Sequence, residues 1–148
     1  MTRDCAWDRP SIRGAFLNSF LRTMTRLHGP DFLQRAAAAR RQIREIDAAG
    51  LKALMADGGY LIDVREAEEF EAGHIWGARH MSASSLPKQA PLILEDRTHP
   101  VAVICSRGNR SAIAALELQA LGYSSVVSLK GGLRDWPEAL VRSPAYGP

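Results

Sequence analysis

Residues 101–122 read VAVICSRGNRSAIAALELQALG, which is a short apolar run, a polar stretch and then a longer apolar run that ends at a glycine. The first run, Val101–Ile104, is rich in β-branched residues and is typical of a buried parallel strand. Residues 112–121 are apolar nearly all round and stop at Gly122, as expected of a buried helix. A strand followed directly by a buried helix is the repeating unit of an α/β domain.

The flanking segments continue this alternation. Asp47 is placed to cap a helix that stops at Gly58, and the segment broken by Pro87 and Pro91 remains unassigned. The other predicted elements are strands at 43–46, 60–64 and 125–129, an acidic helical turn at 66–71, a loop at 73–85 and a last helix at 133–141. The sequence therefore predicts an α/β fold in which a central parallel sheet is flanked by helices.

The charge of the chain is unevenly distributed. Residues 1–44 carry nine arginines and three acids, whereas the remainder carries ten bases and 13 acids. Within the basic part, residues 10–28 place apolar side chains at helical spacing, which predicts an amphipathic helix, and Asp31 is placed to cap a second helix after Pro30. We divide the chain into a basic helical N-terminal extension (1–42), a folded domain (43–142) and a flexible tail (143–148).

Length, composition and cysteine content restrict the class of protein. A chain of 148 residues with 46% hydrophobic and 24% charged residues fits one soluble domain. Two cysteines 100 positions apart are too few for a disulfide framework, and no apolar run reaches the ~18–20 residues of a membrane-spanning helix, so we expect a cytoplasmic protein. The extension is suited to dimerisation, to a partner or membrane surface, or to packing on its own domain, and nucleic-acid binding is not expected.

Cys105 is the candidate reactive residue. It directly follows a predicted strand, at the edge of the sheet where α/β proteins bind ligands. The next six residues contain Arg107, Arg110 and Gly108 and lead into a helix, an arrangement that turns backbone N–H groups towards an anion and favours the thiolate. We therefore expect a nucleophilic Cys105. The alternative is an inert, buried cysteine beside solvated arginines.

Three separated motifs carry a family resemblance. The loop C-S-R-G-N-R-S at 105–111 resembles the active-site loop of rhodanese-like sulfurtransferases, whose pattern is C-R-S-G-x-R-S. L-I-D-V-R-E at 61–66 with G-H-I-W-G-A at 73–78 is similar to the family's L-I-D-V-R-E and G-H-I-P-G-A, and K-G-G-L-R-D-W at 130–136 is similar to its closing G-G-x-x-x-W. The resemblance spans about residues 43–140 and implies a single rhodanese domain.

The resemblance implies a mechanism and a set of residues. Cys105 would take sulfane sulfur from thiosulfate or another persulfide donor, hold it as a persulfide, and pass it to cyanide, a thiol or a protein acceptor. It also implies a catalytic Cys105, a substrate-binding Ser106, Arg107, Gly108, Asn109 and Arg110, and a supporting Asp63, Arg65 and Ser111. We expect Asp63 and Arg65 to form a buried ion pair or hydrogen-bond anchor that braces the loop. No metal or organic cofactor is expected, since His28, His74, His80 and His99 lack zinc-site spacing.

Two departures and two rivals remain. The Ser106-Arg107 order is the reverse of the family's, which leaves the preferred sulfur donor open, and Trp76 replaces the family's proline. A cysteine-dependent phosphatase or arsenate reductase is one rival, but the C-x5-R loop of those phosphatases would place arginine at position 111, where Ser111 stands. The other rival is a noncatalytic scaffold, which retention of Cys105 and both loop arginines disfavours.

Overall fold

The computed structural model describes residues 29–142. The expected amphipathic helix at 10–28, together with Cys5, His28 and the tail at 143–148, lies outside the described residues. The chain separates into two compact units, Met1–Gln34 and Arg35–Pro148, and the helix α2 (Pro30–Arg40) begins in the first and ends in the second. Asp31 lies in the first turn of α2 rather than before it, so its predicted place as the cap is wrong.

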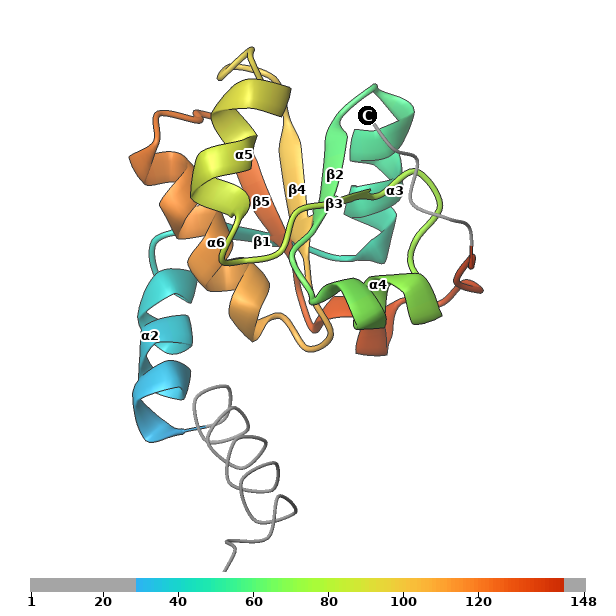
Figure 1. The fold of residues 1–148 in the computed structure, drawn as a ribbon, viewed down its shortest axis with the longest axis horizontal. Coiled ribbons are helices and arrows are strands. Elements are labelled where there is room, and N and C mark those ends of the chain that lie inside the picture. The colour runs from blue at the N-terminus through green and yellow to red at the C-terminus, as the bar shows by residue number, and fades with distance from the viewer. Residues whose placement is uncertain (1–28, 143–148) are drawn as a thin grey trace, which may run out of the picture. The chain divides into compact units, whose positions relative to one another are not determined.

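A five-stranded parallel sheet forms the centre of the second unit (Figure 1). Its strands run in the order β1-β5-β4-β2-β3, with β4 in the middle. Their bounds are β1 (Arg44–Ile46), β2 (Tyr60–Asp63), β3 (Arg79–His80), β4 (Val101–Ile104) and β5 (Val126–Leu129). The four residues of β4 and the four of β5 are all buried, which explains why these strands consist mainly of β-branched and other apolar residues.

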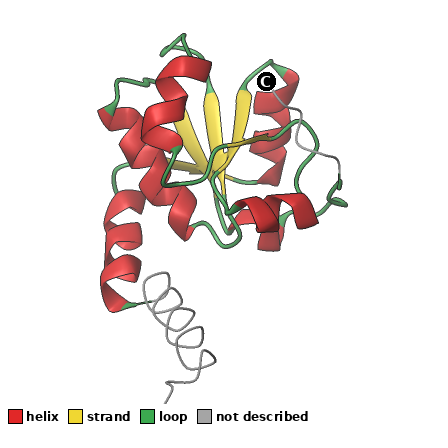
Figure 2. Cartoon of the chain, viewed as in Figure 1, coloured by secondary structure: helices red, strands yellow, loops and turns green. Residues whose placement is uncertain are grey.

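Helices cover both faces of this sheet (Figure 2). They are α3 (Ala48–Ala56), α4 (Ala67–Ala72), α5 (Leu86–Ile93), α6 (Asn109–Ala120) and the 3-10 helix η1 (Gly132–Asp135). Alternate strand residues enter two separate core clusters: Ile62 packs with residues of α5 and α6, whereas Leu61 packs with Leu51 of α3 and with Trp136. The predicted fold class, a parallel sheet flanked by helices, is confirmed.

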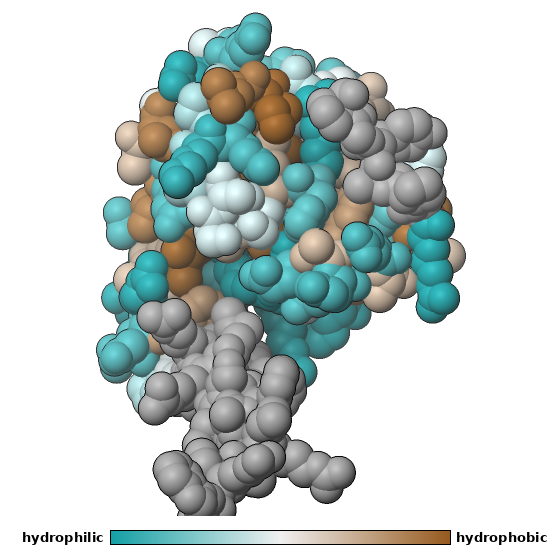
Figure 3. All heavy atoms as spheres, in the orientation of Figure 1, coloured by the Kyte–Doolittle hydropathy of each residue, from teal (hydrophilic) through white to brown (hydrophobic). Residues whose placement is uncertain are grey.

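Exposed apolar side chains gather on α5. Figure 3 shows apolar residues over this helix, where Leu92 and Ile93 are exposed. They lie at the carboxyl end of α5, which connects to the first residue of β4. Cys105 follows the last residue of β4, so the two apolar side chains lie towards the opposite end of the strands. Among the described residues, no helix has the length and apolarity needed to cross a membrane.

Local predictions agree best where one residue decides the structure. The Asp47 carboxylate accepts a hydrogen bond from the Gly50 N–H at 2.8 Å and caps α3 as predicted. The predicted helix at 133–141 is wrong, because only η1 forms there. Pro137 lacks an N–H and forces Trp136 into an extended conformation, with φ −75° and ψ 123°, so the helix cannot continue.

In the middle of the chain the structure also differs in part from the prediction. The predicted loop at 73–85 contains the two-residue strand β3, which is too short to produce a sequence pattern and exists because it pairs with β2. The unassigned segment forms α5, where Pro87 lies in the first turn and needs no N–H partner, and Pro91 lies inside the helix. Helix α6 begins at Asn109, three residues earlier than predicted, so its first turn lies in the candidate site.

Candidate active site

Cys105 lies between the end of β4 and the start of α6. Its side chain and backbone are 1% exposed, and the chain reverses direction in the three residues that follow. Gly108 makes this reversal possible, because it adopts φ +90° and immediately precedes α6. The N-terminal N–H groups of α6 therefore point back towards the cysteine sulfur.

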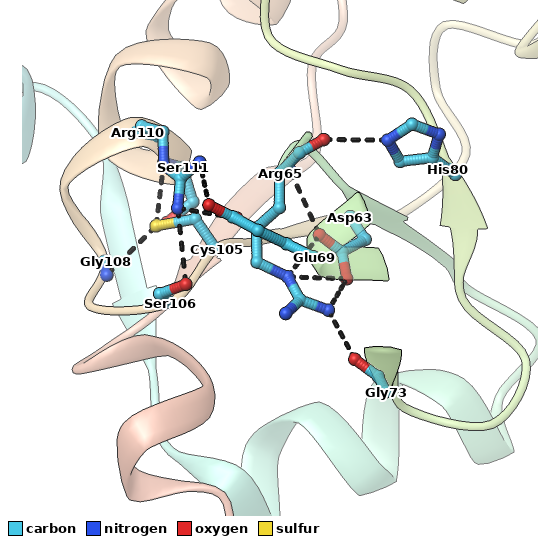
Figure 4. A network of polar contacts seen from close by, with 10 residues as sticks. All are labelled: Asp63, Arg65, Glu69, Gly73, His80, Cys105, Ser106, Gly108, Arg110 and Ser111. Carbon is cyan, nitrogen blue, oxygen red and sulfur yellow. Dashed lines mark hydrogen bonds and ion pairs between the residues drawn. The ribbon is translucent and has the colours of Figure 1, made fainter. Parts of the chain in front are cut away.

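Polar groups surround the sulfur atom (Figure 4). The Gly108 N–H donates to Cys105 Sγ at 3.1 Å, and the Ser111 N–H donates at 3.4 Å. Ser111 Oγ also lies 3.4 Å from Sγ. Backbone donors at a helix N-terminus stabilise negative charge, so this arrangement suits an anionic sulfur.

A second hydroxyl lies behind Ser111. Ser128 Oγ is 2.8 Å from Ser111 Oγ, and Ser128 is fully buried on β5. We did not identify Ser128 from the sequence, where the one available signal is a serine within the otherwise apolar run V-V-S-L at 126–129. Its contact with α6 depends on β5 pairing beside β4, which no local pattern reveals.

Arg110 is held by an acid from another element. Its Nη2 lies 3.0 Å from Glu69 Oε2 of α4, its Nη1 donates to Glu69 Oε1 at 3.3 Å, and Nη2 also donates to Ser106 Oγ at 3.2 Å. The positive charge of Arg110 is therefore balanced in part before any anion arrives. Glu69 was also missed, although it stands in the D-V-R-E-A-E-E-F motif at 63–70.

The other two polar side chains of the loop point to different surroundings. Arg107 is exposed and has no ion-pair partner within residues 29–142. Asn109 Oδ1 accepts a hydrogen bond from Arg40 Nη2 at 2.5 Å. Arg107 is thus the loop cation most open to a dissolved anion, whereas Asn109 is engaged with the end of α2.

The segment that follows β5 holds the Cys105 loop through backbone hydrogen bonds. The Leu133 N–H donates to the Cys105 carbonyl at 2.9 Å and the Arg134 N–H donates to the Ser106 carbonyl at 3.0 Å. Gly132 lies so close to the loop that a Cβ there would be 2.5 Å from the Cys105 carbonyl oxygen. Gly132 of the closing motif is therefore required by this close backbone approach.

Asp63 and Arg65 form the buried ion pair expected from the sequence. Arg65 Nη2 lies 2.8 Å from Asp63 Oδ2, Arg65 Nε donates to Oδ1 at 3.0 Å, and the two residues are 6% exposed or less. Within residues 29–142, the remaining side-chain hydrogen bond of Arg65 reaches the Gly73 carbonyl at 2.7 Å and not the Cys105 loop. The pair therefore fixes the end of α4, the helix that carries Glu69.

The histidines have structural surroundings. His74 Nδ1 lies 2.9 Å from the Phe70 carbonyl oxygen, His80 Nε2 lies 2.7 Å from that of Arg65, and His99 Nε2 lies 2.7 Å from that of Gly58. The residues that the structure describes contain no group of three side chains suited to hold a metal ion. Trp76, the departure from the family pattern, is 72% exposed in the loop after α4.

Known proteins resemble this chain in sequence and in structure. Residues 47–139 match the family model of the rhodanese-like domain. The thiosulfate sulfurtransferase GlpE of Pseudomonas entomophila is 34% identical over 107 residues, which are 72% of this chain and 95% of that protein.

Two solved structures share the fold. The human single-domain sulfurtransferase TSTD1 has a TM-score of 0.58 and 26% identity, over 64% of this chain and 97% of its own. A Rhodopseudomonas palustris protein of unknown function, described as a possible tyrosine phosphatase, has a TM-score of 0.63 and 26% identity, over 71% of this chain and 87% of its own.

Proposed function

The chain belongs to the rhodanese-like domain family, and on that premise we propose that it carries sulfane sulfur from an anionic donor to an acceptor as a Cys105 persulfide. It is a sulfurtransferase, the activity named for both GlpE and TSTD1. The observation that carries the proposed mechanism is the position of Cys105 Sγ, which receives hydrogen bonds from the Gly108 and Ser111 N–H groups.

In the first step the Cys105 thiolate attacks the outer sulfur of thiosulfate or of another persulfide donor. A sulfur–sulfur bond forms to Cys105, the sulfur–sulfur bond within the donor breaks, and its electron pair leaves with sulfite, or with a thiolate when the donor is a persulfide. The enzyme is left with an anionic terminal sulfur, and the N–H groups of the loop and of the first turn of α6 stabilise that charge. Covalent catalysis thereby divides one transfer into two simpler displacements.

In the second step an acceptor removes the terminal sulfur. Cyanide or a thiolate attacks it, the bond to Cys105 breaks, and the electron pair returns to Cys105 as thiolate. In each step a nucleophile attacks the transferred sulfur, and the electron pair of the broken bond stays with the leaving group, so no external oxidant or reductant takes part. The proposed reaction therefore needs no cofactor beyond the cysteine.

The two loop arginines have different proposed roles. Arg107 is exposed and unpaired within residues 29–142, so we assign it to the oxygens of the incoming donor and of the departing sulfite. Arg110 is engaged by Glu69 and by Ser106 Oγ, so its main role is to hold the shape of the loop. The sequence predicts that both arginines bind the substrate, and we assign that role mainly to Arg107.

The decisive measurement is the intact mass of the protein after incubation with thiosulfate. We expect a gain of one sulfur atom in the wild type and in Cys5→Ser, and no gain in Cys105→Ser. Addition of cyanide should return the wild type to its original mass with release of thiocyanate. A wild-type protein that never gains sulfur would contradict the proposal.

An aryl phosphate assay run in parallel tests the phosphatase alternative, which the likeness to the Rhodopseudomonas palustris protein makes worth measuring. We expect no turnover that depends on Cys105, because Ser111 stands where a C-x5-R loop has its arginine. If the protein gains no sulfur and releases no phosphate, the noncatalytic scaffold is the remaining alternative.

The setting of the reaction is also a proposal. A free, reactive thiol suits a reducing cytoplasm. The acceptor is a small thiol, cyanide or the cysteine of a partner protein, and the N-terminal extension at 1–42 is proposed to mediate dimerisation or contact with a partner or membrane surface.

A further inference from the structure

We propose that Ser128 is a positioning residue that favours the thiolate form of Cys105 by acting through the Ser111 hydroxyl. The inference rests on the proposed function, because it concerns the same sulfur atom. It adds a residue from β5, outside all three motifs of the family resemblance, to the machinery of the loop.

The burial of Ser128 is the first observation. Its neighbours Val127 and Leu129 are buried and apolar, and Ser128 itself is 0% exposed. A buried hydroxyl destabilises a protein unless it is hydrogen-bonded, so a serine at this position requires a specific partner. Within residues 29–142 the hydrogen-bond partner of Ser128 Oγ is Ser111 Oγ, at 2.8 Å.

The backbone fixes both hydroxyls in place. Ser128 pairs with Val103 of β4 and with Glu45 of β1, so it lies inside the sheet rather than at an edge. Ser111 lies in the first turn of α6, and both its N–H and its Oγ are 3.4 Å from Cys105 Sγ. The three atoms Cys105 Sγ, Ser111 Oγ and Ser128 Oγ therefore form a hydrogen-bonded chain. The backbones of α6 and β5 hold the two hydroxyls in place.

The count of hydrogen atoms in this chain depends on the state of Cys105. With a thiol there are three hydrogens, on Sγ and on the two hydroxyls, but only two links between the three heavy atoms. Among the hydrogen bonds of residues 29–142, one buried hydrogen is then left without an acceptor, whichever way the hydroxyls turn. With a thiolate, Ser128 donates to Ser111 Oγ and Ser111 donates to Sγ, so every hydrogen is used. The network is complete only when Cys105 is ionised.

Ser128 sets the direction of this chain. When it donates to Ser111 Oγ, the hydrogen of Ser111 is free to face the sulfur. Without Ser128, Ser111 Oγ loses that donor and the thiolate loses part of its stabilisation. The charged and titratable groups on the elements around this end of the sheet include Arg40, Glu45, Asp47, Asp63, Arg65, Glu69, His80, Arg107, Arg110, Lys130, Arg134 and Asp135. None of them is altered by replacing either serine.

The test measures the pH dependence of Cys105 alkylation by iodoacetamide, followed by mass on the peptide that contains Cys105 so that Cys5 is not counted. We expect Ser128→Ala to raise the midpoint of the profile by about half a unit to one unit, which is about three- to tenfold slower alkylation below the wild-type midpoint. Ser128→Thr keeps the hydroxyl and should restore the midpoint. Ser124→Ala, which removes an exposed hydroxyl just before β5, should leave the profile unchanged.

A double mutant separates action through Ser111 from a general effect on the strand. If Ser128 acts through Ser111, Ser111→Ala should raise the midpoint and adding Ser128→Ala should raise it no further. An unchanged profile for Ser128→Ala, or shifts that add in the double mutant, would overturn the proposal. If Ser128→Ala does not fold, an unchanged profile for Ser111→Ala has the same consequence.

Alkylation uses no sulfur donor, so this result is independent of the persulfide measurement. A protein that gains sulfur but shows no shift retains the proposed function and loses this inference. A protein that shows the shift but gains no sulfur retains this inference and loses the proposed function.

Discussion

At the scale of single residues, the site depends on polar side chains that are buried and paired. Asp63 and Arg65 lie at the end of β2 and hold Gly73 at the end of α4. Because α4 also carries Glu69, this ion pair is connected to Arg110 and to the Cys105 loop. A pair of this kind stabilises the protein less by its own attraction than by avoiding an unpaired buried charge.

Replacing Asp63 should therefore be costly. We expect Asp63→Asn to lower the free energy of unfolding by about 3–5 kcal/mol, because it leaves the Arg65 guanidinium buried beside a neutral amide. Urea unfolding followed by circular dichroism measures the loss. Glu138→Gln is the matched control: it neutralises a carboxylate in the exposed pair with Lys52 and should cost under about 1 kcal/mol. Equal losses in the free energy of unfolding for the two variants would contradict the larger cost expected for the buried pair.

At the scale of elements, the sequence predicts what is encoded locally and misses what neighbouring elements impose. The β-branched runs of β4 and β5 are recognisable because both faces of these strands are buried. In contrast, β3 exists through its pairing with β2, and α5 forms despite Pro91. In the same way, Cys105 and its loop are readable from seven consecutive residues, whereas Glu69 and Ser128 reach the site only through the order of the strands.

Helix α3 gives a local prediction that can be measured at both of its ends. Asp47→Ala removes the hydrogen bond to the Gly50 N–H and should destabilise the protein by about 1 kcal/mol, within the usual range of about 0.5–2. Asp57→Ala is the same change at the opposite end, where a negative charge opposes the helix dipole, so it should cost nothing or stabilise slightly. Thermal or urea unfolding of the two variants gives the comparison, and a loss at Asp57 as large as at Asp47 would contradict this interpretation.

At the scale of the whole molecule, the question is where the catalytic unit begins. The charge pattern suggests a domain that starts at residue 43, and that boundary remains a prediction. Arg40 donates to Asn109 Oδ1 at the loop, and the compact unit of the structure starts at Arg35. Burial raises the pKa of Glu117 on α6, and the positive charge of Arg35 offsets part of this rise. Two arginines of the basic extension therefore contact or influence α6 and its first turn.

These contacts predict different behaviour for two shortened chains. A chain that starts at residue 35 should match the full protein in sulfur uptake from thiosulfate, whereas one that starts at residue 43 should take up sulfur more slowly because Asn109 loses Arg40. Its stability should also fall more steeply than that of the longer chain as the pH rises from about 4.5 towards neutrality. The reason is that Glu117 must then ionise in its buried position without Arg35, and a raised pKa in the folded state makes ionisation oppose folding.

Arg40→Gln in the full chain isolates the effect on the loop: it should slow sulfur uptake without the change in pH dependence. Identical uptake and stability for both shortened chains would instead place the boundary at residue 43 and confine the function of Arg35 and Arg40 to the extension.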